Sequence, residues 1–200
     1  MSAFLLLHGW QNRRPAAHWQ SWLAGQLRER GHVADHPQLP DPDAPSLPGW
    51  LEALDAGLAR LAEGEGERVV LAHSLGCLLW LHAAGRPGGV GAPVDRVLLV
   101  SPPDLAVLTG IPEVAGFAAP SVDAGQVAAA AASTRVVAGD DDPYSHTGAH
   151  DGVLRPLGLD DLAVDVVPGG GHLDLGAGYG DWPSVLAWCE DPTTRLVPRR

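Results

Sequence analysis

Long apolar runs are missing from this sequence of 200 residues. None approaches the roughly 20 consecutive apolar residues of a transmembrane helix, and we expect no membrane partner. Residues 1–7 lack the basic stretch of a secretory leader, so we expect no leader here. The 2 cysteines, Cys77 and Cys189, are too few and too far apart for a disulfide framework. Their scarcity favours a reducing compartment, and we predict a cytoplasmic protein.

Basic residues are also scarce, with 13 Lys and Arg against 24 Asp and Glu and a net charge of −11. Nucleic-acid binding relies on neutralising phosphates, so we expect no nucleic-acid partner. The basic cluster formed by Arg195, Arg199 and Arg200 is expected to be a frayed end. The composition, 46% hydrophobic and 18% charged, is that of a globular protein. We predict one domain over residues 1–192 and a C-terminal tail over residues 193–200.

Short apolar runs alternate with helical patterns along the chain. Runs typical of strands buried in a parallel sheet occupy residues 3–7, 32–36, 68–72, 94–100, 134–138 and 163–167. Helical spacing predicts helices over residues 19–30, 50–61, 75–84, 145–157 and 183–189. Irregular patterns predict a proline-rich loop over 37–48, a turn over 64–67, and a small lid or helix pair over 104–132. The alternation predicts an α/β fold: a doubly wound, six-stranded, mostly parallel sheet with helices on both faces.

Polar side chains follow four of these strands at the point where each ends. They are His8, Ser74, the run 140–142 and His172. Ligands of doubly wound sheets bind at the carboxyl ends of the strands, so we expect these side chains to share one site.

Ser74 lies between a strand pattern and a helix pattern, the setting of a G-x-S-x-G nucleophile turn. Residues two before and two after such a serine must be small, because they meet across the bend. Gly76 satisfies this condition, whereas Ala72 replaces the usual glycine with one extra methyl group. The motif is therefore weak by itself and needs a base, an acid and an oxyanion hole elsewhere in the chain.

His172, in a glycine-rich loop after the last strand, is the best candidate for the base that activates Ser74. His73 adjoins the serine on a tight turn and is expected to project away from the hydroxyl. The histidines of two pairs, 32 with 36 and 146 with 150, are expected at the surface, with a metal site at the second pair as an alternative.

The acid is expected among three adjacent carboxylates. Asp142 is favoured because Pro143 fixes the chain after it, and the order serine, aspartate, histidine suits an α/β-hydrolase. Asp140 and Asp141 are interpreted as capping or surface residues, and Asp104 is the alternative acid.

An oxyanion hole requires two backbone N–H groups. We expect them from Leu75, directly after the nucleophile, and from Trp10, after the first strand. Candidate pocket residues are His8, Trp10 and His73, although a structural hydrogen-bonding role is favoured for His8 and simple packing is an alternative for Trp10.

Several motifs together resemble the small serine hydrolases related to retinoblastoma-binding protein 9 and their bacterial YdeN-type relatives. The motifs are His8-Gly9-Trp10-Gln11, His18-Trp19-Gln20-x-Trp22-Leu23, Ala72-His73-Ser74-Leu75-Gly76, Asp142-Pro143-Tyr144, and Gly171-His172 with Gly178-x-Gly180-x-Trp182-Pro183. The resemblance implies a compact α/β-hydrolase without a large cap and a triad of Ser74, Asp142 and His172. Ala72, Cys77 and Asp174 depart from the residues usual in relatives, at positions that bear on pocket shape.

These observations predict a serine hydrolase that cleaves small esters, thioesters or amides through an acyl-enzyme, with a small-molecule acyl substrate as its partner. We expect no cofactor and no metal. An acyltransferase with the same triad and a non-catalytic protein-interaction domain remain alternatives, although nothing in the sequence indicates a protein partner. A metal-dependent hydrolase lacks a recognised ligand spacing, and the glycines at 176, 178 and 180 fail the dinucleotide-binding pattern.

Overall fold

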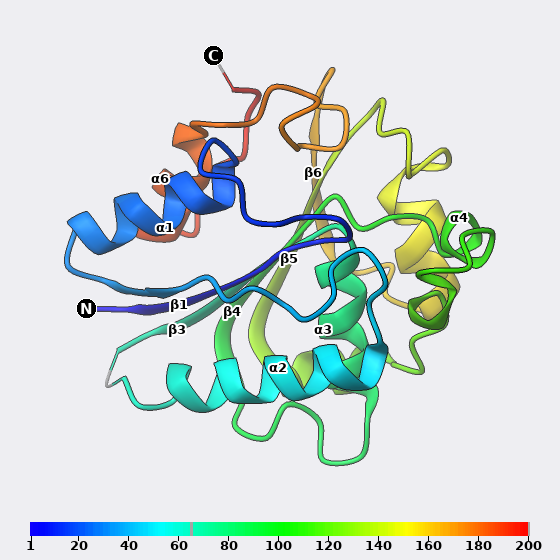
Figure 1. Ribbon diagram of the computed structural model, residues 1–200, viewed down its shortest axis with the longest axis horizontal. Coiled ribbons are helices and arrows are strands. Elements are labelled where there is room, and N and C mark those ends of the chain that lie inside the picture. The colour runs from blue at the N-terminus through cyan, green and yellow to red at the C-terminus, as the bar shows by residue number, and fades with distance from the viewer. Residues whose placement is uncertain (65, 200) are drawn as a thin grey trace.

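A six-stranded parallel sheet organises the structure, a computed structural model that describes residues 1–64 and 66–199 (Figure 1). The strands are β1 (Ala3–Leu7), β2 (Val33–Asp35), β3 (Arg68–His73), β4 (Val94–Val100), β5 (Ala131–Gly139) and β6 (Ala163–Val167). Their order in the sheet is β2-β1-β3-β4-β5-β6, and all five pairings are parallel. The order reverses direction at β1, which confirms the predicted doubly wound α/β fold.

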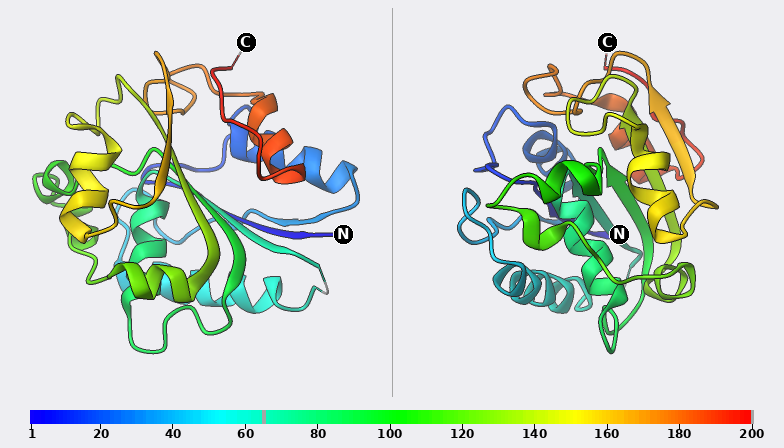
Figure 2. Two further views of the ribbon diagram at one scale, coloured as in Figure 1. Left: turned by 180° about the vertical axis from the view of Figure 1, so that it is seen from behind. Right: turned by 90° about the vertical axis from the view of Figure 1, so that its right-hand side faces the viewer.

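Helices cover both faces of the sheet. The longer ones are α1 (Trp19–Glu29), α2 (Leu47–Leu61), α3 (Leu75–Gly85), α5 (Ala124–Ala130) and α6 (Pro183–Glu190). Shorter turns are α4 (Leu105–Thr109), η1 (Ala115–Phe117), η2 (His150–Leu154) and η3 (Arg155–Leu157). Figures 1 and 2 show α1 and α6 on one face and α2 and α3 on the other. Among the described residues, no helix combines the length and apolar character needed to cross a bilayer.

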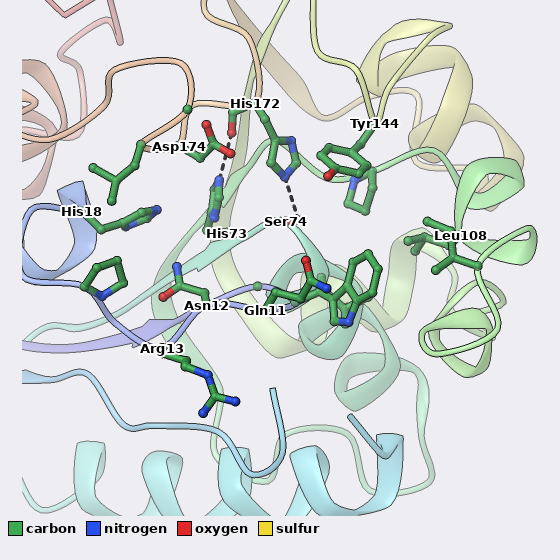
Figure 3. A pocket seen from close by; sticks show the side chains of 18 residues that line it. Gln11, Asn12, Arg13, His18, His73, Ser74, Leu108, Tyr144, His172 and Asp174 are labelled. Carbon is green, nitrogen blue, oxygen red and sulfur yellow. Dashed lines mark hydrogen bonds between the residues drawn. The ribbon is translucent and has the colours of Figure 1, made fainter. Parts of the chain in front are cut away.

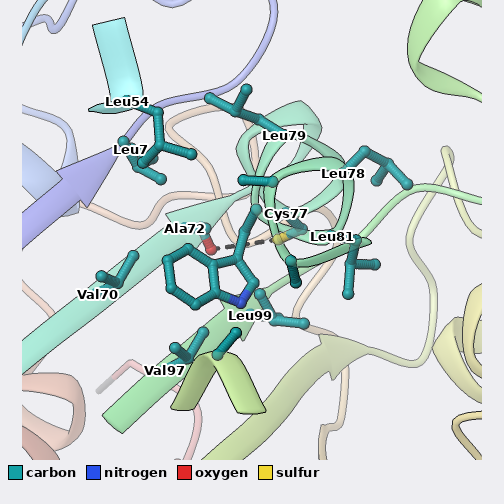
Figure 4. Close-up of a cluster of buried hydrophobic side chains, with 14 of the residues drawn as sticks. Leu7, Leu54, Val70, Ala72, Cys77, Leu78, Leu79, Leu81, Val97 and Leu99 are labelled. Carbon is teal, nitrogen blue, oxygen red and sulfur yellow. Dashed lines mark hydrogen bonds between the residues drawn. The ribbon is translucent and has the colours of Figure 1, made fainter. Parts of the chain in front are cut away.

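Alternating strand residues feed two separate hydrophobic cores. Leu5 and Leu7 of β1 pack into the core under α2 and α3, part of which Figure 4 shows. Phe4 and Leu6 of the same strand pack into the core under α1 and α6. Successive side chains of a strand point to opposite faces, so a continuous apolar run is what a sheet covered on both sides requires.

The structure corrects one predicted helix and defines one segment for which the prediction was open. The helix predicted over residues 145–157 is reduced to η2 and η3, because Gly148 has a left-handed φ of +79° that a regular helix does not allow. In the segment 104–132, α4 and η1 form a small cap whose Val114 and Phe117 are buried in the core. Its last part, α5, is an ordinary crossover helix before β5.

The segment after α6 is held against the domain by a few contacts, although most of its residues are exposed. Leu196 is 3% exposed, and the indole N–H of Trp182 donates to the carbonyl of Val197 at 2.9 Å. The backbone N–H of Leu196 also donates to Asp165 of β6 at 3.3 Å. These contacts hold the chain as far as Val197 and correct the expectation of a frayed end for Arg195, whereas Arg199 is exposed. Arg200 lies outside the described residues, as does Glu65 in the turn predicted over residues 64–67.

Candidate active site

Ser74 occupies the sharp turn between β3 and α3, with φ +54° and ψ −123°. This conformation costs an L-residue on the order of 1–3 kcal/mol and must be held by its surroundings. Its N–H donates to the carbonyl of Val100 at 2.9 Å. A Cβ on Gly76 would lie 2.9 Å from the carbonyl oxygen of His8, so glycine is required there. Ala72 meets no such limit, because its side chain lies inside β3 and is buried in the core.

His172 and Asp142 continue a hydrogen-bonded chain from the serine (Figure 3). His172 Nε2 lies 2.8 Å from the Oγ of Ser74, and its Nδ1 lies 2.8 and 3.0 Å from the carboxylate oxygens of Asp142. A carboxylate at neutral pH only accepts, so Nδ1 carries the proton and Nε2 accepts from the serine hydroxyl. The Asp142 side chain is fully buried and that of His172 is 8% exposed.

Two further carboxylates hold the loop that carries His172. Asp140 accepts from the backbone N–H of Gly169 at 2.7 Å, and Asp141 accepts from that of Gly171 at 2.6 Å. Gly139 allows this close approach, since a Cβ there would lie 2.2 Å from the carbonyl oxygen of Gly171. Asp140 and Asp141 were interpreted as capping or surface residues; although exposed, they tie the β5 loop to the β6 loop.

Asp104, the alternative acid, makes no hydrogen bond to His172 in the part of the chain that the structure describes. Its carboxylate accepts from the Ser145 hydroxyl at 2.8 Å and from the N–H and hydroxyl of Thr147 at 3.2 and 3.1 Å. A Cβ on Gly152 would overlap the Asp104 carboxylate, at 1.6 Å. Asp104 therefore joins the start of α4 to the segment after β5.

Trp10 and Leu75, the expected oxyanion donors, both line the pocket around Ser74. Within residues 1–64 and 66–199 neither backbone N–H donates to a protein acceptor. For Leu75 this follows from its place as the first residue of α3, whose N–H has no partner within the helix. Gly9 brings the other turn close, since a Cβ on it would lie 2.7 Å from that of Ser74.

His8 lies beneath this site and does not line the pocket, which corrects its assignment as a pocket residue. Its Nδ1 donates to the carbonyl of Gly9 at 2.8 Å, and its Nε2 accepts from the N–H of Leu39 at 2.9 Å. Burial lowers the pKa of His8 to about 4, so the ring is neutral and ties the proline-rich loop to β1. His36, expected at the surface, is also buried, and burial lowers its pKa to about 3.

The two histidines for which a metal site was the alternative have different surroundings. His146 is exposed in a turn, whereas the Nδ1 of His150 lies 3.1 Å from the Asp151 carboxylate. The part of the chain that the structure describes holds no group of three or more potential metal-ligating His, Cys, Asp or Glu side chains.

A pocket of about 390 Å³ opens over Ser74 between two unlike walls (Figure 3). The apolar wall consists of Pro103, Leu108, Ile111 and Tyr144. The polar wall consists of Asn12, Arg13, His18 and Asp174. Figure 3 shows Leu108 and Tyr144 on one side of Ser74 and the polar wall on the other.

Sequence reasoning identified neither wall as such. Tyr144 entered only as part of a motif, yet its ring lies 4.7 Å from that of His172, centroid to centroid. Its position two residues after the proposed acid is the sequence signal that could have identified it as a pocket residue. Leu108 and Ile111 carried no signal, because the irregular segment 104–132 gave no face on which to place them.

Comparison with known proteins agrees with this architecture. The ydeN gene product from B. subtilis is 25% identical, with 95% of this chain and 97% of that one covered and a TM-score of 0.76. A YdeN-like hydrolase from Pectobacterium atrosepticum is 20% identical over 95% and 90% of the two chains, with a TM-score of 0.64. N-formylmaleamic acid deformylase from Pseudomonas putida is 16% identical over 86% of each chain, with a TM-score of 0.54. The similarity to the Pectobacterium and Pseudomonas proteins shows a shared fold alone.

The comparison with curated proteins gave no match. The family model described as serine hydrolase matches residues 4–190, which include all three members of the hydrogen-bonded chain. This match extends over nearly the whole chain, and it agrees with the hydrolase fold found by structural comparison. The protein therefore belongs to the serine hydrolase family, of the YdeN type.

Proposed function

We propose that this hydrolase cleaves small esters, thioesters or amides through an acyl-enzyme on Ser74, with His172 as base and Asp142 as acid. The observation that carries the proposal is the continuous chain of 2.8 Å contacts from Ser74 Oγ through the imidazole to a buried carboxylate. A serine hydroxyl is a poor nucleophile until a positioned base removes its proton, and this arrangement supplies that base.

In the first step Ser74 Oγ attacks the substrate carbonyl while its proton passes to His172 Nε2. The imidazolium that forms is stabilised by the Asp142 carboxylate at 2.8 Å. The oxyanion accepts from the free N–H groups of Trp10 and Leu75, and the positive end of the α3 dipole adds to this stabilisation. Collapse of the tetrahedral intermediate returns the proton from His172 to the leaving group.

The second step repeats the chemistry with water. His172 takes a proton from a water molecule as its oxygen attacks the acyl carbonyl, and Ser74 leaves with that proton restored. The carboxylic acid product and the free enzyme result. The same residues would transfer the acyl group to another acceptor only if that acceptor displaced water from the pocket.

Substrate size and polarity follow from the two walls. A pocket of about 390 Å³ suits a small acyl compound. We assign a short apolar arm of the substrate to the apolar wall, and an arm with hydrogen-bonding groups to the polar wall, where Asn12, His18 and Asp174 lie.

Labelling with a fluorophosphonate tests the nucleophile directly. The wild-type protein should be labelled, and Ser74→Ala should abolish both labelling and ester turnover. Ser121→Ala, which changes an exposed serine, is the matched control and should behave as the wild type. Labelling that persists in Ser74→Ala would exclude the triad. A folded wild-type protein with neither labelling nor turnover would favour the interaction domain, and turnover that a chelator stops would favour a metal-dependent reaction.

A further inference from the structure

His73, directly before the nucleophile, makes an unexpected contact with the proposed base. Its Nε2 lies 3.0 Å from the carbonyl oxygen of His172, and the two rings are 5.1 Å apart, centroid to centroid. A carbonyl oxygen only accepts, so Nε2 of His73 must carry a proton. The sequence correctly placed this side chain away from the serine hydroxyl, and the structure shows that it reaches the backbone of the base instead (Figure 3).

His73 lines the pocket over Ser74, as expected, although it is only 3% exposed, and other aromatic rings pack around it. Trp19 packs edge-on against it at 5.8 Å, and His18 does so at 5.4 Å, both between ring centroids. Complete burial, together with neighbouring imidazoles, holds the pKa of His73 well below its ordinary value. The ring is therefore neutral, and with Nε2 protonated its Nδ1 has a free lone pair. Within the described residues this buried Nδ1 has no hydrogen-bond partner.

His18 has the complementary arrangement. It caps the N-terminus of α1, where its Nδ1 accepts from the backbone N–H of Gln20 at 3.2 Å. Burial lowers the pKa of His18 to about 4, so this ring is neutral too and carries its proton on Nε2. That buried Nε2 also has no partner among the described residues. Figure 3 shows the His18 ring extending toward His73, so an unused donor and an unused acceptor belong to adjacent rings.

We propose that His73 is a positioning residue, whose Nε2–H fixes the backbone of His172. Asp140 and Asp141 hold the loop through N–H groups upstream of His172, whereas His73 holds it through the carbonyl of His172 itself. Leu173, the next residue, has a left-handed φ of +49°, a conformation that needs such external support. This role of His73 rests on the proposed function, because the proposed function assigns His172 as the base.

The first test examines the tautomers in the wild-type protein, where no variant can fail to fold. Histidines are labelled with ¹⁵N, and two-bond ¹H–¹⁵N correlation spectra are recorded from pH 5.5 to 8. His73 and His18 should both be neutral Nε2–H tautomers across this range, and His73→Gln and His18→Gln assign their signals. An Nδ1–H tautomer or a cation at His73 would overturn the proposal, whether or not the triad is correct.

The second test compares two substitutions at residue 73. His73→Phe keeps a ring but removes the donor, and it should lower kcat and the fluorophosphonate labelling rate about 10- to 100-fold with KM within about twofold, since small displacements of a reacting group have effects of this size. In His73→Gln, the amide N–H₂ can replace the Nε2–H donor and should restore both rates to within about threefold of the wild type. His146→Phe, at an exposed histidine, is the control and should change neither.

A purely structural role would predict a different pattern. Both variants at residue 73 would then lower the melting temperature, while kcat per labelled active site stayed at the wild-type value. That result, or a His73→Phe enzyme with unchanged kcat, would refute the positioning role. If Ser74→Ala retained turnover, the proposed function would fail instead, and the tautomer spectra would still decide the state of His73.

Discussion

Replacing Asp142 by asparagine tests the electrostatic part of the proposed mechanism. The substitution keeps the size of the side chain but removes a charge that is fully buried and 2.8 Å from His172 Nδ1. At an effective dielectric constant of about 20, two unit charges this far apart attract by about 6 kcal/mol. This attraction exists only while the imidazolium is present, so its loss raises the barrier by about that amount. We expect kcat to fall by about four orders of magnitude.

The assay compares kcat for p-nitrophenyl butyrate in the wild type, in Asp142→Asn and in the control Asp141→Asn. The control removes a neighbouring charge that accepts from the N–H of Gly171 and does not contact the imidazole ring. It should lose less than about tenfold. Melting temperatures within a few degrees of one another ensure that folded proteins are compared. A loss below about tenfold in Asp142→Asn would refute the assignment of the acid.

Three other outcomes follow from the structure. Each buried methylene contributes about 0.8 kcal/mol, so kcat/KM for p-nitrophenyl esters should rise about fourfold per methylene from acetate to butyrate. Leu108→Asn should reduce this dependence on chain length. A wild-type enzyme with the same kcat/KM for all these esters would contradict the assignment of the apolar wall. Ala72→Gly should leave kcat within about twofold while lowering the free energy of unfolding by about 1 kcal/mol, measured in urea, because the methyl is buried in the strand and does not obstruct the turn. The pKa values of His8, His18 and His36 are lowered to about 4, 4 and 3, so below pH 6.5 the unfolded chain binds protons that the folded one does not. The free energy of unfolding should therefore fall from pH 6.5 toward pH 4, by roughly 1.4 kcal/mol per pH unit for each histidine, and the melting temperature should fall with it. His36→Gln should make this fall less steep. A melting temperature that stays constant over this range would contradict the reasoning.

Much of the fold could be predicted because its signals are local. Strands buried on both faces require continuous apolar runs, and those at 3–7, 94–100 and 163–167 have the observed limits. Gly31 ends the first helical pattern, and it adopts a left-handed φ of +82°. The helix predicted over 145–157 failed because a left-handed glycine and a proline interrupt it. Its buried apolar residues, Ala149, Val153 and Leu154, pack into the core under α2 and α3. Its polar residues Ser145 and Thr147 donate to the buried carboxylate of Asp104.

The candidate site was predictable in position more than in detail. Parallel strands bring their carboxyl ends to one edge, so His172 and Ser74 could be paired although 98 residues separate them. The separate roles of three adjacent aspartates depend on which loop faces them, and that arrangement is tertiary. For the same reason the contact from His73 to a backbone carbonyl 99 residues away had no counterpart in the sequence pattern.

The hydrogen bonds between the β5 and β6 loops make the proposed acid and the proposed base parts of one unit. Three hydrogen-bonded pairs join the two loops, and the partners follow one another in the same order along both: Asp140 with Gly169, Asp141 with Gly171, and Asp142 with His172. An insertion between residues 140 and 142, or between residues 169 and 172, would put these contacts out of register, so neither segment can lengthen by itself. Loop exchange with another α/β-hydrolase should therefore succeed only when residues 139–144 and 168–174 are transferred as a matched pair.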